Sequence, residues 1–154
     1  MLIPLFLLAQ QAVAFTNVTV IPMDRERVLA NQTVVVVGPR ITEVGPAGQV
    51  KIPGGATRID GRGKFLMPGL AEMHAHIPPG NATDADIEKV LAYFALNGVT
   101  TVRGMLGAPR HLVYRDRAAK GEVLSPTIYT TGPSLNGNSV PTVEAAIKAV
   151  TDQK

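Results

Sequence analysis

The second half of the chain alternates between short strands and amphipathic helices, and this alternation constrains the fold more than any other feature. Strands are predicted at residues 65–76, 99–103 and 127–131, and each is followed by a predicted helix, at 84–97, 109–120 and 142–151. This order is typical of right-handed parallel βαβ units. The chain has 154 residues, whereas a closed (β/α)8 barrel typically needs about 250. The sequence therefore predicts three parallel βα units over residues 65–154, in a chain too short for a closed barrel.

The first half of the chain has a different pattern. From residue 15, short segments rich in valine, isoleucine and threonine recur between turns that contain glycine, proline and polar residues. Short strands spaced by about 8–12 residues indicate an all-β part. The sequence therefore predicts a separate all-β part over residues 15–64.

Two of the three histidines of the chain, His74 and His76, lie at the end of the first predicted strand of the α/β part. Alternate residues of a strand share one face, about 7 Å apart along the chain. Two imidazoles on one face can bind one metal ion, but zinc usually takes three or four ligands. The strand thus offers half of a metal site. On spacing alone, two ordinary core or loop histidines are the commoner interpretation. The residues of the chain just before His74 are largely apolar, which predicts a buried strand.

The segment around this pair resembles the signature that opens the barrel of the amidohydrolase superfamily, commonly Pro-Gly-Leu-Ile-Asp-x-His-x-His. The matching residues are Pro68, Gly69, Leu70, His74 and His76. Glu72 stands where the family usually has Asp, and because Glu is one methylene longer, no direct metal contact is assigned to it. The likeness covers residues 15–154 by general pattern, while only the barrel-opening motif is specific. Within the superfamily the chain is most similar to the imidazolonepropionase-like and prolidase-like group.

This resemblance implies a fold and a reaction. The implied fold is α/β with an N-terminal all-β part. A partial β-sandwich over residues 15–64 is followed, over residues 65–154, by the first three βα units of an incomplete TIM (β/α)8 barrel. The reaction is hydrolysis of a C–N bond, in an amide, a cyclic amide or a dipeptide, by water that one or two divalent ions activate, commonly Zn2+. His74 and His76 are the expected metal ligands. The family's other ligands and its general base lie on later strands, so no catalytic residue is assigned and the chain alone is expected to be inactive.

The expected partner is a small amide or dipeptide-like substrate, and the full-length protein is compatible with a homo-oligomer. In a barrel, the active site lies on the loops at the C-terminal ends of the strands. Arg103 ends the second predicted strand, where it either contacts substrate or forms an ion pair inside the barrel. Gly132, Ser134 and Asn136 follow the third strand, in a loop that either lines the pocket or is a solvated turn. His111 falls within a predicted helix and is expected on the surface.

Charge and composition exclude several other functions. The net charge is +3 and the isoelectric point about 9.5. However, the basic residues are scattered among acidic ones, and aromatic residues make up only 5% of the chain. Nucleic-acid binding is therefore not expected. The chain has no cysteine, which excludes disulfides and thiolate metal sites.

Residues 1–14 read MLIPLFLLAQQAVA and combine a short apolar run with an Ala-x-Ala pattern at Ala12–Ala14. The apolar run is far shorter than the roughly 20 residues of a membrane span, and no basic residue precedes it. The pattern predicts a secretory signal with a clipped start, and hence a periplasmic or secreted protein; without export the protein is cytoplasmic. A buried first strand is the alternative.

Two other hypotheses stay open on sequence grounds. In the first, the chain is a non-catalytic binding or assembly module that retains the start of the fold. In the second, it is an unrelated α/β protein in which the histidine motif is accidental. A reading frame that continues beyond Lys154 with further strand–helix units would exclude the module. Metal binding through His74 and His76 would exclude the accidental motif.

Overall fold

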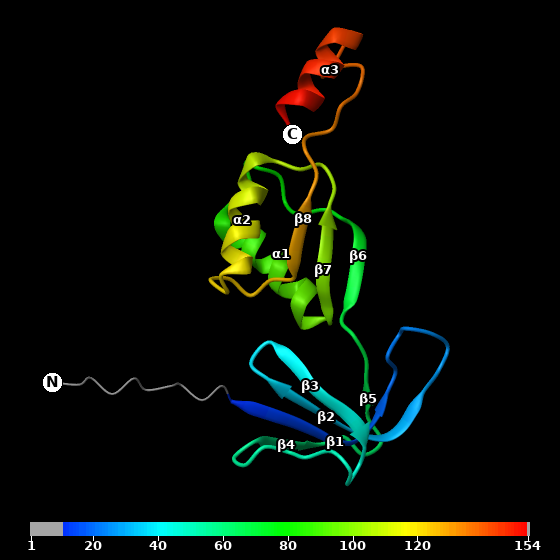
Figure 1. Cartoon of the computed structure of the whole chain (residues 1–154). Helices are drawn as coiled ribbons and strands as arrows, with labels where there is room; N and C mark the ends of the chain where they lie inside the picture. Colours follow the sequence, from blue (N-terminus) through cyan, green and yellow to red (C-terminus); the bar gives the residue numbers. More distant parts are fainter. Residues whose placement is uncertain (1–10, 154) are drawn as a thin grey trace, which may run out of the picture. The chain divides into compact units, whose positions relative to one another are not determined.

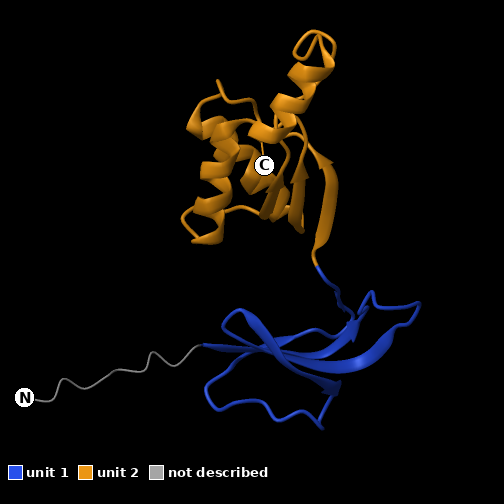
Figure 2. Ribbon diagram, turned by 45° about the horizontal axis from the view of Figure 1, so that its top comes forward, with its two compact units in different colours: residues 1–68 blue, residues 69–154 orange. Residues whose placement is uncertain are grey.

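A computed structural model describes residues 11–153 of the chain. The chain divides into two compact units, Met1–Pro68 and Gly69–Lys154 (Figure 2). The predicted division into an all-β part and an α/β part has the same order, but it falls after Pro68 rather than after residue 64.

The first unit is a five-stranded mixed sheet (Figure 1). Its strands are β1 (Ala12–Val20), β2 (Leu29–Val37), β3 (Arg40–Pro46), β4 (Thr57–Asp60) and β5 (Phe65–Leu66). The strand order is β3-β2-β1-β4, and β5 also pairs with β1. β1 is antiparallel to β2 but parallel to β4 and β5. Branched side chains such as Val18, Val20 and Val34 form its core, as expected of residues that favour a pleated, half-buried surface.

The second unit contains three parallel strands, each followed by a helix (Figure 1). Its elements are β6 (Leu70–Ala75), α1 (Asp84–Leu96), β7 (Val99–Gly104), α2 (Pro109–Ala119), β8 (Thr127–Thr130) and α3 (Val143–Asp152). The sheet order is β6-β7-β8. This confirms the predicted fold class, an all-β part followed by three βα units.

Helices α1 and α2 cover one face of the β6-β7-β8 sheet (Figure 1). Ile87, Leu91 and Tyr114 of these helices form one buried cluster with Val102 and Ile128 of the strands. Helix α3 has no buried residue. The second unit therefore has a one-sided core, and the opposite face of its sheet is open to solvent.

The start of α1 is fixed by its capping residues. Thr83 accepts a hydrogen bond from the backbone N–H of Asp86, and the Asp86 carboxylate accepts one from the Thr83 N–H. This reciprocal pair satisfies two N–H groups that the helix itself cannot bond. Gly98, with φ of +79°, follows the end of the helix, where glycine has no steric cost.

The prediction of one buried strand over residues 65–76 is wrong in two respects. The segment forms two strands, because β5 pairs with β1 in the first unit whereas β6 pairs with β7 in the second. Leu70 and Met73 are also 51% and 58% exposed. Met73 is exposed because it lies with Thr101, Arg103 and Tyr129 on the face of the sheet that the helices do not cover.

Most of the predicted secretory signal lies outside the described residues. The last three residues of the predicted signal, Ala12–Ala14, begin β1. In this strand Ala14 is fully buried and pairs with Val35 and Arg58. Cleavage after Ala14 would remove these residues from the strand, and export stays a prediction. Between residues 11 and 153, no helix is long and apolar enough to cross a membrane.

Candidate functional site

His74 and His76 lie together at the C-terminal end of β6. Their ring centres are 5.2 Å apart and the ring planes are tilted by 35°. Ala75 and Ile77 alternate with them and are buried under the helices. Both imidazoles therefore lie on the exposed, helix-free side of the strand, as the sequence predicts for the pair.

A bulge at the end of β6 sets the direction of His74. Glu72 pairs with Val102 and Ala75 pairs with Gly104, so β6 has one more residue than β7 over this stretch. Bulges of this kind re-aim a side chain and are common beside active sites. The Glu72 carboxylate accepts a hydrogen bond of 2.8 Å from the His74 backbone N–H. Glu72 thus supports the backbone of a candidate ligand.

The separation of the two rings fits a shared metal ion. Zinc binds imidazole nitrogens at about 2.0–2.1 Å in a tetrahedral arrangement, which puts two bound ring centres about 5 Å apart. The observed 5.2 Å agrees with that value. Within residues 11–153, no group of three histidine, aspartate or glutamate side chains is close enough to hold a metal ion. The described residues therefore supply two ligands of a site that needs more.

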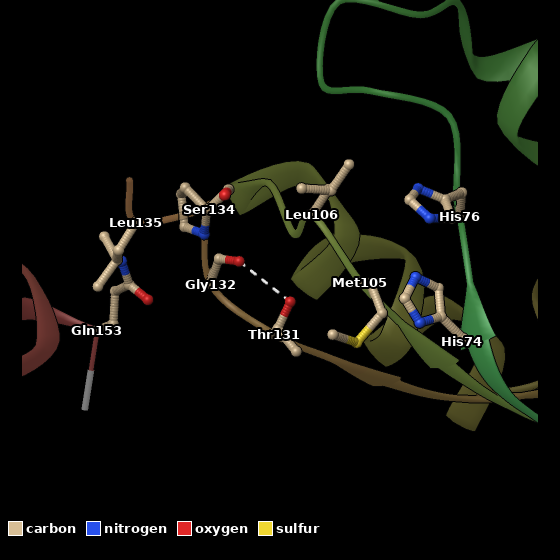
Figure 3. Close-up of a pocket in the computed structure, with 10 residues that line it drawn as sticks. His74, His76, Met105, Leu106, Thr131, Gly132, Ser134, Leu135 and Gln153 are labelled. Atoms are coloured by element: carbon tan, nitrogen blue, oxygen red, sulfur yellow. Dashed lines mark hydrogen bonds between the residues drawn. The ribbon is translucent and has the colours of Figure 1, made fainter. Parts of the chain in front are cut away.

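The pair borders a hollow of about 370 Å³ beside the ends of the strands (Figure 3). Figure 3 shows the imidazoles on one side and the loops after β7 and β8 on the other. Its other lining residues are Met105, Leu106, Thr131, Gly132, Pro133, Ser134, Leu135 and Gln153. The hollow thus combines two imidazoles with largely apolar and small side chains, as is common in pockets for small molecules.

The loops that form this wall are held close together. The Gly107 N–H donates to the Gly132 carbonyl at 3.1 Å, and the Thr131 N–H donates to the Gly104 carbonyl at 3.0 Å. A Cβ on Gly107 would lie 1.6 Å from the Thr131 carbonyl oxygen, so only glycine fits there. Leu106 has φ of +55°, a strained conformation for a leucine. The wall is therefore tightly constrained at Leu106 and Gly107.

The structure places Arg103 apart from the histidine pair. Its side chain lines a separate hollow of about 350 Å³ with Met73, Thr101 and Tyr129 on the open face of the sheet. Among the described side chains, none forms a salt bridge with Arg103. The predicted ion pair is thus not found within residues 11–153. The substrate role of Arg103 stays a prediction.

The loop after β8 contributes some of its predicted residues to the site. Gly132 and Ser134 line the hollow with the histidines. Asn136 does not line it; its side chain accepts hydrogen bonds from the backbone N–H groups of Asn138 and Ser139. Asn136 therefore stabilises the turn.

The expectation that His111 lies on the surface is wrong. His111 is fully buried in α2. The Ala108 N–H donates to its Nδ1 atom at 3.2 Å, and its Nε2 lies 2.8 Å from the Pro78 carbonyl oxygen. The sequence does contain a signal for this backbone contact. Pro109 marks the first residue of α2, and the side chain of the third helical residue often bonds back to the residue before the helix.

Behind the site, polar contacts join the starts of α1 and α2. The Tyr114 hydroxyl donates to Asp84 at 2.6 Å, and Arg110 forms an ion pair with the same carboxylate. These two contacts, the tyrosine bond first, hold the pKa of Asp84 below its ordinary value. Burial and the neighbouring carboxylate raise the pKa of Tyr114. The cluster is structural, because it does not line the hollow with the histidines.

Comparison with known proteins supports the resemblance found in the sequence. The chain is 33% identical over 88 residues to adenine deaminase 2 of Bradyrhizobium sp. strain ORS 278, which covers 56% of this chain and 14% of that protein. It is 37% identical over 65 residues to imidazolonepropionase of Stenotrophomonas maltophilia, over 41% of this chain and 16% of that protein. A crystal structure of a protein assigned as a prolidase, from Bifidobacterium longum, superposes with a TM-score of 0.80 at 29% identity, over 94% of this chain and 38% of that one. These similarities support the interpretation of the chain as a fragment of an amidohydrolase superfamily protein. No protein-family model matches it.

The chain spans 38% or less of the length of each of these amidohydrolases. The relatives include hydrolases of C–N bonds, and the superfamily is typically metal-dependent. The predicted kinship with imidazolonepropionase and prolidase is confirmed.

Proposed function

We infer that this chain supplies the His74–His76 half of the metal site of an amidohydrolase that cleaves a C–N bond in a small amide, cyclic amide or dipeptide. The observation that carries the proposal is the ring separation of 5.2 Å at the C-terminal end of β6. In barrels, residues that bind substrate and metal are found at this end of the strands.

Each described residue has a limited part in this function. His74 and His76 would hold the ion, and the backbone N–H bond to Glu72 orients the first of them. A divalent ion bound there, commonly zinc in this superfamily, supplies the Lewis acidity that activates water near neutral pH. The apolar wall beside the pair, including Met105 and Leu106, would exclude solvent from one side of a small substrate.

Zinc affinity of the purified 154-residue chain tests the proposal. Titration calorimetry on wild type, His74→Ala and His76→Ala should give a dissociation constant at least about tenfold higher in each variant, since each lacks an imidazole ligand. Ser134→Ala is the control, because Ser134 lines the same hollow but adds no imidazole. Equal affinities in all four proteins, or no zinc binding by wild type, would contradict the proposal.

The same chain should hydrolyse no amide at a measurable rate. Two imidazoles leave zinc short of the three protein ligands that catalytic sites use. The assay measures release of amine from simple amides and dipeptides, with and without zinc. A zinc-dependent rate that His74→Ala abolishes would show that this expectation is wrong.

A further inference from the structure

His111 is buried, carries polar atoms and has no part in the function proposed above. It is the third residue of α2, and its side chain is 0% exposed. Both ring nitrogens have partners: the Ala108 N–H on one side and the Pro78 carbonyl on the other. A buried polar group with a complete set of partners fixes the segments that it joins.

The two partners determine the state of the ring. The Ala108 N–H is a donor, so Nδ1 must accept and carries no proton. Nε2 therefore carries the proton and donates it to the Pro78 carbonyl oxygen at 2.8 Å. The imidazole is neutral, and neither nitrogen is free to bind a metal ion.

The position of these partners connects His111 with the candidate metal ligands. Pro78 lies two residues after His76, in the loop between β6 and α1, while Ala108 ends the loop between β7 and α2. These two loops leave neighbouring strands beside the hollow of the histidines. Pro78 has no N–H of its own. Among the described residues, His111 is the only hydrogen-bond partner of the Pro78 carbonyl.

A second bond from α2 holds the far end of the same loop. Arg110 donates to the Ala82 carbonyl just before α1, and the Ala82 N–H donates to the Pro79 carbonyl at 2.8 Å. On the strand side of His76, the Met105 N–H donates to the Ala75 carbonyl at 2.8 Å. On the loop side, the His111 bond is the first hydrogen bond that the described residues form after His76. Without it, no hydrogen bond from α2 would hold the Pro78 carbonyl after the strand ends.

We propose that His111 is a positioning residue for His76, which fixes the exit of β6 through the Pro78 carbonyl and so holds the His76 ring in the direction needed to share an ion with His74. The proposal rests on the metal site proposed above. Hydrogen-bonded groups behind metal ligands typically change metal affinity by about 10–100-fold when they are removed.

A matched pair of substitutions separates the two bonds of His111. The side-chain amide of His111→Gln can reach the place of Nε2 and donate to Pro78. The shorter side chain of His111→Asn can replace Nδ1 and accept from Ala108, but it does not reach Pro78. Each variant retains one of the two bonds. A residue with only a core role would give both variants a similar zinc affinity.

We expect His111→Gln to bind zinc within about threefold of wild type and His111→Asn to bind it about tenfold more weakly. In the Asn variant, amide hydrogen exchange should also accelerate in a peptide covering residues 77–83. Ile87→Val, a change in the same buried cluster away from this bond, controls for a general loss of stability. Equal zinc affinities in the Gln and Asn variants, or weaker binding by Gln, would overturn the proposal.

A measurement on wild type remains decisive if the Asn variant does not fold. Long-range 1H–15N NMR should show the Nε2-protonated form of His111, and zinc should shift its Nε2 signal together with those of His74 and His76. Zinc-induced shifts of His74 and His76 with no change at His111 would refute the coupling. Absence of zinc binding by wild type would instead refute the metal site itself, so the two failures are distinguishable.

Discussion

The close approach of two loops at Gly107 gives a sharp prediction for the stability of the second unit. In Gly107→Ala, the new Cβ would lie 1.6 Å from the Thr131 carbonyl oxygen, whereas ordinary contact begins at 3.4 Å. The two backbones would have to separate by about 1.8 Å. The hydrogen bond of 3.1 Å between the Gly107 N–H and the Gly132 carbonyl cannot persist after such a shift.

The expected cost follows from these two effects. Overpacking typically costs about 1–3 kcal/mol, and loss of one hydrogen bond costs about 1 kcal/mol. Gly107→Ala should therefore lower the free energy of unfolding by about 2–4 kcal/mol. That is a large share of the roughly 5–15 kcal/mol that stabilises a typical domain.

Urea denaturation followed by tyrosine fluorescence measures this loss of stability in the second compact unit, where Gly107 lies. All three tyrosines, Tyr93, Tyr114 and Tyr129, lie in the second unit, and the chain has no tryptophan. With a denaturant slope of about 1–3 kcal/mol/M, a loss of about 2–4 kcal/mol should lower the midpoint by about 0.7–4 M.

Gly137→Ala provides the matched control. Gly137 lies in the loop after β8, has no left-handed backbone angle, and a Cβ there would meet no atom within 4 Å. Its free energy of unfolding should stay within about 0.5 kcal/mol of that of wild type. If Gly107→Ala unfolds at the same urea concentration as Gly137→Ala, the close approach of the two loops does not exist in solution.

Two further predictions concern the helices behind the site. Thr83→Ala removes the capping bond to the Asp86 N–H and should cost about 1 kcal/mol in the same urea assay; an unchanged midpoint would show that the cap contributes nothing. Tyr114→Phe removes the largest cause of the lowered Asp84 pKa. Because the folded pKa is lowered, the stability from this contact is present above the unfolded carboxyl pKa of about 3.9 and is lost as pH falls through the folded value. The variant should therefore be less stable than wild type at pH 7. As the pH falls below 4, its free energy of unfolding should decrease less than that of wild type; parallel pH profiles of the two proteins would contradict this.

Local patterns in the sequence were sufficient to predict the elements of the second unit. The predicted helices at 84–97 and 109–120 match α1 and α2 to within one residue, because helix caps and stops act over one turn. The alternation of strands and helices also predicted a parallel sheet, since the short connections allow few other topologies. His74 and His76 were found as a pair because a strand places alternate residues on one face.

Other features depended on contacts between distant segments. The apolar run before His74 divides between two sheets, which its composition does not reveal, because β5 finds its partner in β1 and β6 in β7. Arg103 lies near the end of its strand as expected, but only the tertiary structure shows that it lines a different hollow from the histidines.

By itself, the sequence determined the order of the elements, the all-β and α/β parts, and a histidine pair on one face of a strand. These features follow from interactions within a few residues along the chain. The tertiary structure alone decided the burial of His111 and its bond to Pro78, the close approach of Gly107 to Thr131, and the ring separation of His74 and His76. Those contacts depend on how strands, helices and loops pack in three dimensions, and the spacing of residues along a chain does not encode such distances directly.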